Sequence, residues 1–129
     1  MTTELSYLTA SAVLTALLWV PYILDVLLKN KLSDAVGYAD LTMSPWAARL
    51  KKAHYNAIES LAPFAAVVLV ANAVGLSNEA TTMSAAVYFW ARVVHPVAYT
   101  FAIPWVRTIA FLVAWAATIC IAWQICANT

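Results

Sequence analysis

The stretch LSYLTASAVLTALLWVPYIL, residues 5–24, contains no charged side chain over its whole length. A helix of twenty residues is about 30 Å long, which matches the hydrocarbon core of a bilayer. The stretch is too long for the core of a signal peptide, and no basic residue precedes it, so we expect a retained membrane helix. Pro21 is expected to kink this helix, because neighbouring helices can accommodate a kink in a membrane.

The remainder of the chain is similarly apolar. Of its 129 residues, 64% are hydrophobic and 10% are charged, whereas a soluble domain contains about 25% charged residues. A soluble fold of this size could not bury so much apolar surface, because small domains hide only about two-thirds of what the unfolded chain exposes. Glycine is scarce, and the alternating ten-residue segments of a membrane barrel are absent. The composition therefore predicts an all-α integral membrane protein.

Three further apolar segments follow, so the chain is expected to form one left-handed bundle of four membrane helices over residues 1–129. Ser44 and Pro45 indicate a helix start, with serine as the cap and proline at the first helical position. Gly75 is a plausible C-terminal cap. The polar residues between Asp25 and Ser44 predict one substantial loop. The expected helices cover about residues 5–28, 45–75, 80–101 and 106–126.

The basic residues predict the orientation in the membrane. Six of them belong to the loop side, namely Lys29, Lys31, Arg49, Lys51, Lys52 and Arg107, whereas Arg92 lies within the third helix. The opposite side, with both termini and the Ser77–Glu79 turn, has neither lysine nor arginine. By the positive-inside rule the loop side is cytoplasmic and both termini face out. The short length and the lack of a targeting segment favour a bacterial inner membrane.

Ionisable residues lie at depths where a charge costs at least about 2.5–3.5 kcal/mol. Glu59 is inside the second helix, and Arg92 and His95 are inside the third. Their helical spacing places Asn56 with Glu59 on one stripe, and Arg92 with His95 and Tyr99 on another. These stripes predict a Glu59–Arg92 pair, within one subunit or between two.

Two interpretations of these stripes remain open. The pair can be structural glue, but interhelical polar contacts average only about 0.6 kcal/mol, and intramembrane ionisable groups are functional candidates by default. Together with Arg107 at the turn between the third and fourth helices, the stripe around His95 indicates a site for an anion. No metal site is expected, since the six-residue spacing of Cys120 and Cys126 matches no metal-binding pattern. No nucleic-acid partner is expected either.

Three motifs, in order, resemble the MAPEG family, the membrane-associated proteins in eicosanoid and glutathione metabolism. The second helix contains RLKKAHYNAIESLAPF at residues 49–64, the third contains RVVHPVAY at residues 92–99, and the turn after it contains PWVRT at residues 104–108. The chain length and the four-helix layout agree as well. The chain is therefore identified as a MAPEG-like protein, and a bacterial member is expected.

The resemblance implies a homotrimer that binds glutathione as co-substrate between subunits, near the cytoplasmic face. Arg107 matches the arginine that holds the glutathione thiolate and is the expected catalytic residue. The positions that match glutathione-holding residues are Arg49, Lys52, Asn56, Glu59, Arg92, His95 and Tyr99. A thiol with a pKa of ~8.5 is mostly protonated at neutral pH, and a nearby cation lowers that pKa by about 1–3 units. The reactive thiolate would thereby be enriched.

The resemblance favours a glutathione transferase or peroxidase acting on lipophilic electrophiles or lipid hydroperoxides within the bilayer. The sequence departs from some members at Lys52, where they have arginine, at Tyr55, where they have a further arginine, and at Phe111, where they have tyrosine. These departures permit an alternative, a non-catalytic membrane scaffold that has lost glutathione chemistry. A proton or ion pathway is a third hypothesis, but the first and fourth helices offer no groups to continue a relay.

Overall fold

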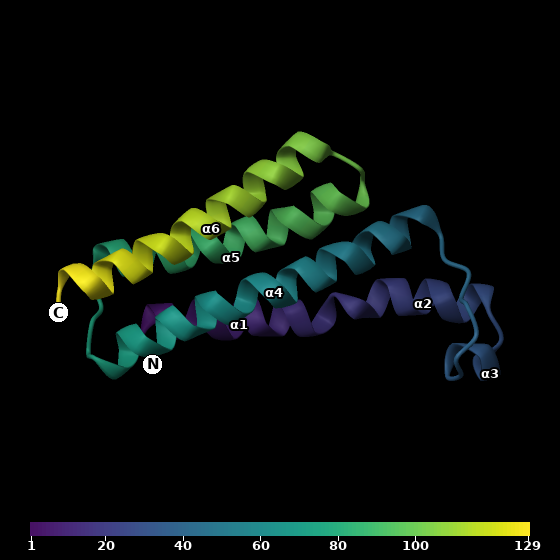
Figure 1. The fold of residues 1–129 in the computed structure, drawn as a ribbon, viewed down its shortest axis with the longest axis horizontal. Coiled ribbons are helices and arrows are strands. Elements are labelled where there is room, and N and C mark those ends of the chain that lie inside the picture. The colour runs from purple at the N-terminus through teal and green to yellow at the C-terminus, as the bar shows by residue number, and fades with distance from the viewer.

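The computed structural model describes residues 1–129 and consists of helices and short connections. The six helices are α1 (Thr3–Leu17), α2 (Trp19–Lys29), α3 (Leu32–Ala35), α4 (Pro45–Ala73), α5 (Glu79–Thr100) and α6 (Pro104–Ala127). The predicted all-α class is confirmed. Figure 1 shows α2 continuing the direction of α1, with α4, α5 and α6 running alongside and α3 in the connection at the far end.

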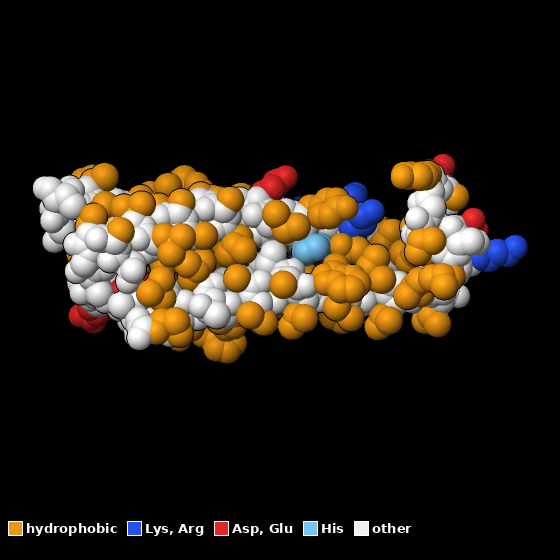
Figure 2. All heavy atoms as spheres, turned by 90° about the horizontal axis from the view of Figure 1, so that it is seen from below, with side chains coloured by type: hydrophobic (Ala, Val, Ile, Leu, Met, Phe, Trp, Pro, Cys, Tyr) orange, Lys and Arg blue, Asp and Glu red, His pale blue; other side chains and the backbone are white.

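Three helical segments are long and apolar enough to cross a membrane: Thr3–Lys29, Pro45–Ala73 and Pro104–Ala127. The segment α5 is not among them; it has 22 residues, and Arg92 and His95 interrupt its apolar character. Apolar side chains cover most of the surface in Figure 2, where the visible lysine and arginine side chains are confined to the end near α3 and to one patch beside a histidine. These features agree with a helical membrane protein.

The first predicted helix is broken into α1 and α2 at Leu18, one turn before Pro21. Proline has no N–H to offer the carbonyl of Leu17, and its ring would collide with that carbonyl in an undistorted helix. The helix is therefore interrupted at Leu18, while α2 keeps the direction of α1 (Figure 1). Further along, α2 extends through Asp25 to Lys29, so the connection to α4 is shorter than the predicted loop and contains α3.

Ser44 and Pro45 do begin α4, but the serine side chain does not cap its own helix. The carboxylate of Asp25 accepts hydrogen bonds from the N–H and the hydroxyl of Ser44, at 2.8 and 2.7 Å. This contact ties α2 to the start of α4. At the other end, Gly75 follows the last turn of α4 with a φ of 73°, as expected for a glycine in a left-handed C-terminal cap.

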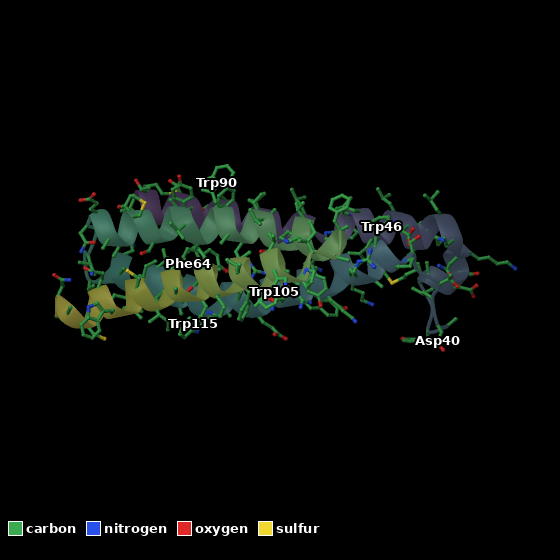
Figure 3. The ribbon with its side chains drawn as sticks, turned by 90° about the horizontal axis from the view of Figure 1, so that it is seen from above. Asp40, Trp46, Phe64, Trp90, Trp105 and Trp115 are labelled. Carbon is green, nitrogen blue, oxygen red and sulfur yellow. The ribbon has the colours of Figure 1, made fainter.

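The core lies between α4, α5 and α6. The rings of Phe64 and Tyr88 stack with their centroids 3.6 Å apart, and Figure 3 shows Phe64 between the ribbons. Around them lie small buried residues, including Ala71, Ala85 and Ala114. Small side chains let membrane helices approach closely, so van der Waals packing stabilises the contact where no hydrophobic effect operates between helices.

Both chain ends and the α4–α5 turn meet at one end of the molecule (Figure 1). There the buried carboxylate of Glu4 accepts hydrogen bonds from the hydroxyls of Ser77, Thr81 and Thr82, at 2.9, 2.6 and 3.1 Å. The turn is also bonded to α6, since the Asn78 amide donates to the Gln124 side chain at 3.0 Å. These polar contacts join α1, α5 and α6 at the end opposite the predicted site.

Candidate functional site

Three adjoining cavities form a groove between α4 and α6, with α5 at its base. The first and second share Tyr99 and Arg107, and the second and third share Asn56 and Phe111. Their volumes are about 270, 260 and 280 Å³. Each alone is close to the lower limit of a ligand pocket, about 300 Å³, and joined together they exceed it. We call this feature the α4–α6 groove.

The groove has α4 as one wall and α5 as its base. Two hydrogen bonds fix the register of these two helices. The hydroxyls of Ser60 and Tyr88 share a hydrogen bond of 3.0 Å, and Nε of Arg49 donates to the carbonyl oxygen of Thr100, also at 3.0 Å. The helices are antiparallel. Starting from the Ser60–Tyr88 pair, four residues back along α4 therefore correspond to four residues forward along α5. Asn56 therefore lies level with Arg92.

Buried polar atoms without hydrogen-bond partners gather at this level. They are all three guanidinium nitrogens of Arg92, Nδ1 of His95 and Oδ1 of Asn56. Arg92 and His95 are each 2% exposed. A buried polar group without a partner costs about 1–3 kcal/mol, and more if it is charged, so such groups in a native protein indicate a ligand, an ion or water.

The first cavity is strongly cationic. Arg49 and Arg107 both line it, and no carboxylate does. The guanidinium carbon of Arg107 lies 4.7 Å from the centre of the Tyr99 ring, and the ring of His95 meets Tyr99 edge-on at 5.7 Å. A cation over an aromatic face within about 6 Å is held by electrostatic attraction. This end of the groove is suited to an anion.

The third cavity has a mixed lining from α4 and α6. Asn56, Glu59, Ser60 and Thr118 line it with polar side chains, and Pro63, Phe111, Trp115 and Ile119 with apolar ones. Figure 3 shows Trp115 directed away from the helix packing, at the flank of the molecule. The groove thus passes from a cationic end at Arg107 to a flank where large apolar side chains lie beside polar ones.

The predicted Glu59–Arg92 pair is wrong within this chain, because every nitrogen of Arg92 lacks a partner and Glu59 is exposed. Residues three apart on a helix differ in direction by about 60°. When Asn56 faces α5, Glu59 is consequently turned toward the rim of the third cavity.

The other predicted site residues fall into two groups. The structure brings Arg49, Asn56, Glu59, His95, Tyr99 and Arg107 to the lining of the groove, with Arg92 buried beside it. Lys52 is exposed and lines none of the three cavities.

Sequence reasoning missed Ser60, which lines the third cavity, and Tyr88, whose hydroxyl shares a hydrogen bond with that of Ser60. A signal was present in the spacing. Ser60 follows Asn56 by four residues and Tyr88 precedes Arg92 by four, so each belongs to one of the predicted polar stripes. Thr108 and Thr118, which line the second and third cavities, were also missed.

The apolar helices and the groove define a helical membrane protein with a polar, cationic site at the side of its helix bundle. The MAPEG family model matches residues 6–127, and the chain belongs to the MAPEG family. This family is generally associated with glutathione and includes transferases and peroxidases as well as non-catalytic members. A search of curated proteins found no match to the chain.

Proposed function

We propose that this protein is a membrane glutathione transferase or peroxidase that acts on lipophilic electrophiles or lipid hydroperoxides. The observation that carries the proposal is the set of unpartnered buried polar atoms of Asn56, Arg92 and His95 next to a cationic groove. Family membership adds glutathione as the polar ligand to consider first.

The chemistry of glutathione fits the residues present. The tripeptide carries two carboxylates, one ammonium group, two amides and a thiol. Arg92 offers a fork of donors for a carboxylate, which arginine binds with two parallel hydrogen bonds. Oδ1 of Asn56 accepts from an N–H, and the carboxylate of Glu59 suits the ammonium group. Arg49 adds a second cation at the open end. Lys52 and Tyr99 complete the proposed binding set, Lys52 as an exposed positive charge.

Arg107 is the proposed catalytic residue. It lines both the first and the second cavity, so a thiol lying in the groove passes next to its guanidinium group. A cation at about 4–6 Å favours a thiolate over a thiol. In conjugation, the thiolate attacks an electrophilic carbon to form a thioether, and either a leaving group departs from that carbon or the addition product takes up a proton. In peroxide reduction, the thiolate attacks the terminal oxygen of the hydroperoxide, the O–O bond breaks, and the alkoxide departs and takes up a proton. The glutathione sulfenic acid left behind then reacts with the thiol of a second glutathione to give the disulfide and water. Phe111, Trp115 and Ile119 in the third cavity would contact the lipophilic partner.

We propose further that the protein works as a homotrimer of four-helix subunits with left-handed packing, in which α5 is the remaining membrane crossing. In that arrangement both termini face outward and the Arg107 end of the groove faces the cytoplasm, as the basic residues favour. A bacterial inner membrane is the proposed location. Mass measurement in mild detergent tests the trimer, and reporter fusions at the C-terminus test the orientation.

A non-catalytic role is the second candidate, and the position of Lys52 favours it. This lysine is exposed and outside the groove, and Phe111 places a ring without a hydroxyl between the second and third cavities. A scaffold of this kind would keep the fold and lose glutathione binding.

Titration of the purified protein with glutathione separates the two candidates. Calorimetry reports binding, and ultraviolet absorbance reports the bound thiolate, with S-methylglutathione as the control ligand whose sulfur cannot form a thiolate. Arg92→Met should abolish binding, whereas Lys51→Met, which removes a cation from α4 outside the groove, should not. Absence of binding to the wild-type protein would support the scaffold.

A further inference from the structure

We propose that Arg49 is a positioning residue: it fixes the turn between α5 and α6, and through this turn it sets the direction of Arg107. The inference rests on the proposed role of Arg107 in activating the thiol. It gives Arg49 a task separate from contact with the ligand.

The last turn of α5 shows why a side chain is needed there. The final four carbonyl groups of a helix have no partner within it. Three of them accept hydrogen bonds from the backbone N–H groups of residues 101–103. The fourth, the carbonyl of Thr100, accepts from Nε of Arg49 at 3.0 Å. Arg49 is the one side chain of another helix that hydrogen-bonds to this turn, and its positive charge complements the negative end of the helix dipole.

The turn itself is strained. Ala102 has a φ of 56°, the left-handed conformation that a side chain disfavours. The N–H of Ile103 reaches back to the carbonyl of Ala98 at 2.9 Å, which defines the same C-terminal motif that ends α4. There the left-handed residue is Gly75, and the strain is absent. A non-glycine residue persists in this conformation only where surrounding contacts hold it, and Arg49 supplies such a contact.

Arg107 depends on this turn for its placement. Ile103 is the N-terminal cap of α6, and its carbonyl accepts the N–H of Arg107 at 3.1 Å. The guanidinium of Arg107 lies over the ring of Tyr99. Tyr99 is in the last turn of α5, directly before the strained turn at Ala102. If the turn relaxes, both the base of the Arg107 side chain and the ring beneath its charged end move. A displacement of about 1 Å at a reacting group can lower a rate a hundredfold.

A direct contact between Arg49 and glutathione is the competing explanation, and Ala102→Gly distinguishes it from positioning. Glycine adopts the left-handed conformation without strain, so this change stabilises the turn and adds no group that binds a ligand. If Arg49 acts through the turn, Ala102→Gly should restore function to Arg49→Ala. If Arg49 acts by touching the ligand, no such rescue is possible.

The experiment uses the full-length protein in lipid nanodiscs as wild type, Arg49→Ala, Ala102→Gly and the double variant. Lys51→Ala is the matched control, because it removes a neighbouring cation of α4 that does not contact α5. Hydrogen exchange of the peptide covering residues 98–107 reports the turn without any ligand. Glutathione affinity and the absorbance of the bound thiolate are measured on the same samples.

Positioning predicts that Arg49→Ala speeds exchange of this peptide, and that it lowers the thiolate fraction or kcat about tenfold. The thiolate fraction and kcat are measured at saturating glutathione, so that weaker binding does not contribute to the loss, and the double variant should recover about half of this loss. Unchanged exchange in Arg49→Ala would overturn the proposal, as would a loss of thiolate at saturating glutathione that Ala102→Gly leaves uncorrected. Arg107→Ala is run in parallel: if it leaves the thiolate unaltered, the proposed function fails, while the exchange data still decide whether Arg49 holds the turn.

Discussion

Arg107 and Tyr99 come from different helices, and the guanidinium of the first lies 4.7 Å above the ring of the second. A contact of this kind contributes about 0.5–2 kcal/mol, depending on how far water is excluded. Tyr99→Leu should therefore lower the bound thiolate fraction by about twofold to thirtyfold, because Arg107 loses its support. Tyr99→Phe keeps the ring and should retain most of the thiolate signal. Equal losses in both variants would assign the effect to the hydroxyl.

Arg107→Ala should leave glutathione bound and raise the pKa of its thiol. A rise of two units corresponds to about 2.7 kcal/mol and moves the thiolate absorbance to higher pH by the same two units. Conjugation of a lipophilic electrophile should slow in parallel at neutral pH, and the rate should recover as the pH is raised. A variant with wild-type absorbance and turnover would show that Arg107 is only an anchor at the membrane interface.

Arg92→Met should stabilise the ligand-free protein and abolish glutathione binding. Arg92 is 2% exposed and none of its nitrogens has a partner, and replacing a buried charged group by an apolar one of similar size is often stabilising by about 1–4 kcal/mol. Thermal unfolding in detergent is the measurement, with and without glutathione. The wild type should gain stability with glutathione and the variant should not. A lower Tm for the ligand-free variant would mean that Arg92 already has a partner in the assembled protein.

Gly75 and Ala102 occupy equivalent left-handed positions after α4 and α5, with φ values of 73° and 56°. Gly75→Ala should destabilise the protein by about 1–2 kcal/mol, the cost of the left-handed conformation for a residue with a side chain. No atom lies within 4 Å of the added Cβ, so strain alone is tested. Ala102→Gly should instead stabilise the protein. Urea unfolding measures the free energy of unfolding of both variants. If this free energy changed in the same direction in both, the prediction would be contradicted.

The helical class and the membrane setting were predictable because they depend on properties summed over many residues. Twenty uncharged residues in succession require a helix across lipid, whatever their neighbours are. Local signals were informative as well: Pro21 indicated the break in the first segment, and Gly75 the left-handed residue after α4. Whether α5 crosses the membrane is harder to predict from such sums, since Arg92 and His95 lower its apolar character.

The site was less predictable because side-chain partners depend on how helices rotate and align. Spacing placed Glu59 on the stripe of Asn56, and both line the third cavity, but a difference in direction of about 60° leaves Asn56 half-buried and Glu59 exposed. The contact from Arg49 to Thr100 joins a side chain to a backbone carbonyl. Every residue has such a carbonyl, so no pattern of residue types marks which one is left unpaired.

The third cavity opens on the flank of the bundle, where Trp115 is 57% exposed and Ile119 is 48% exposed. If this flank faces lipid, a lipophilic substrate arrives by lateral diffusion and not from water. The concentration that governs its rate of capture is then its mole fraction in the bilayer. Added lipid would dilute the substrate at constant bulk concentration, and the apparent KM would rise in proportion. Partitioning, as well as shape, would select the substrate.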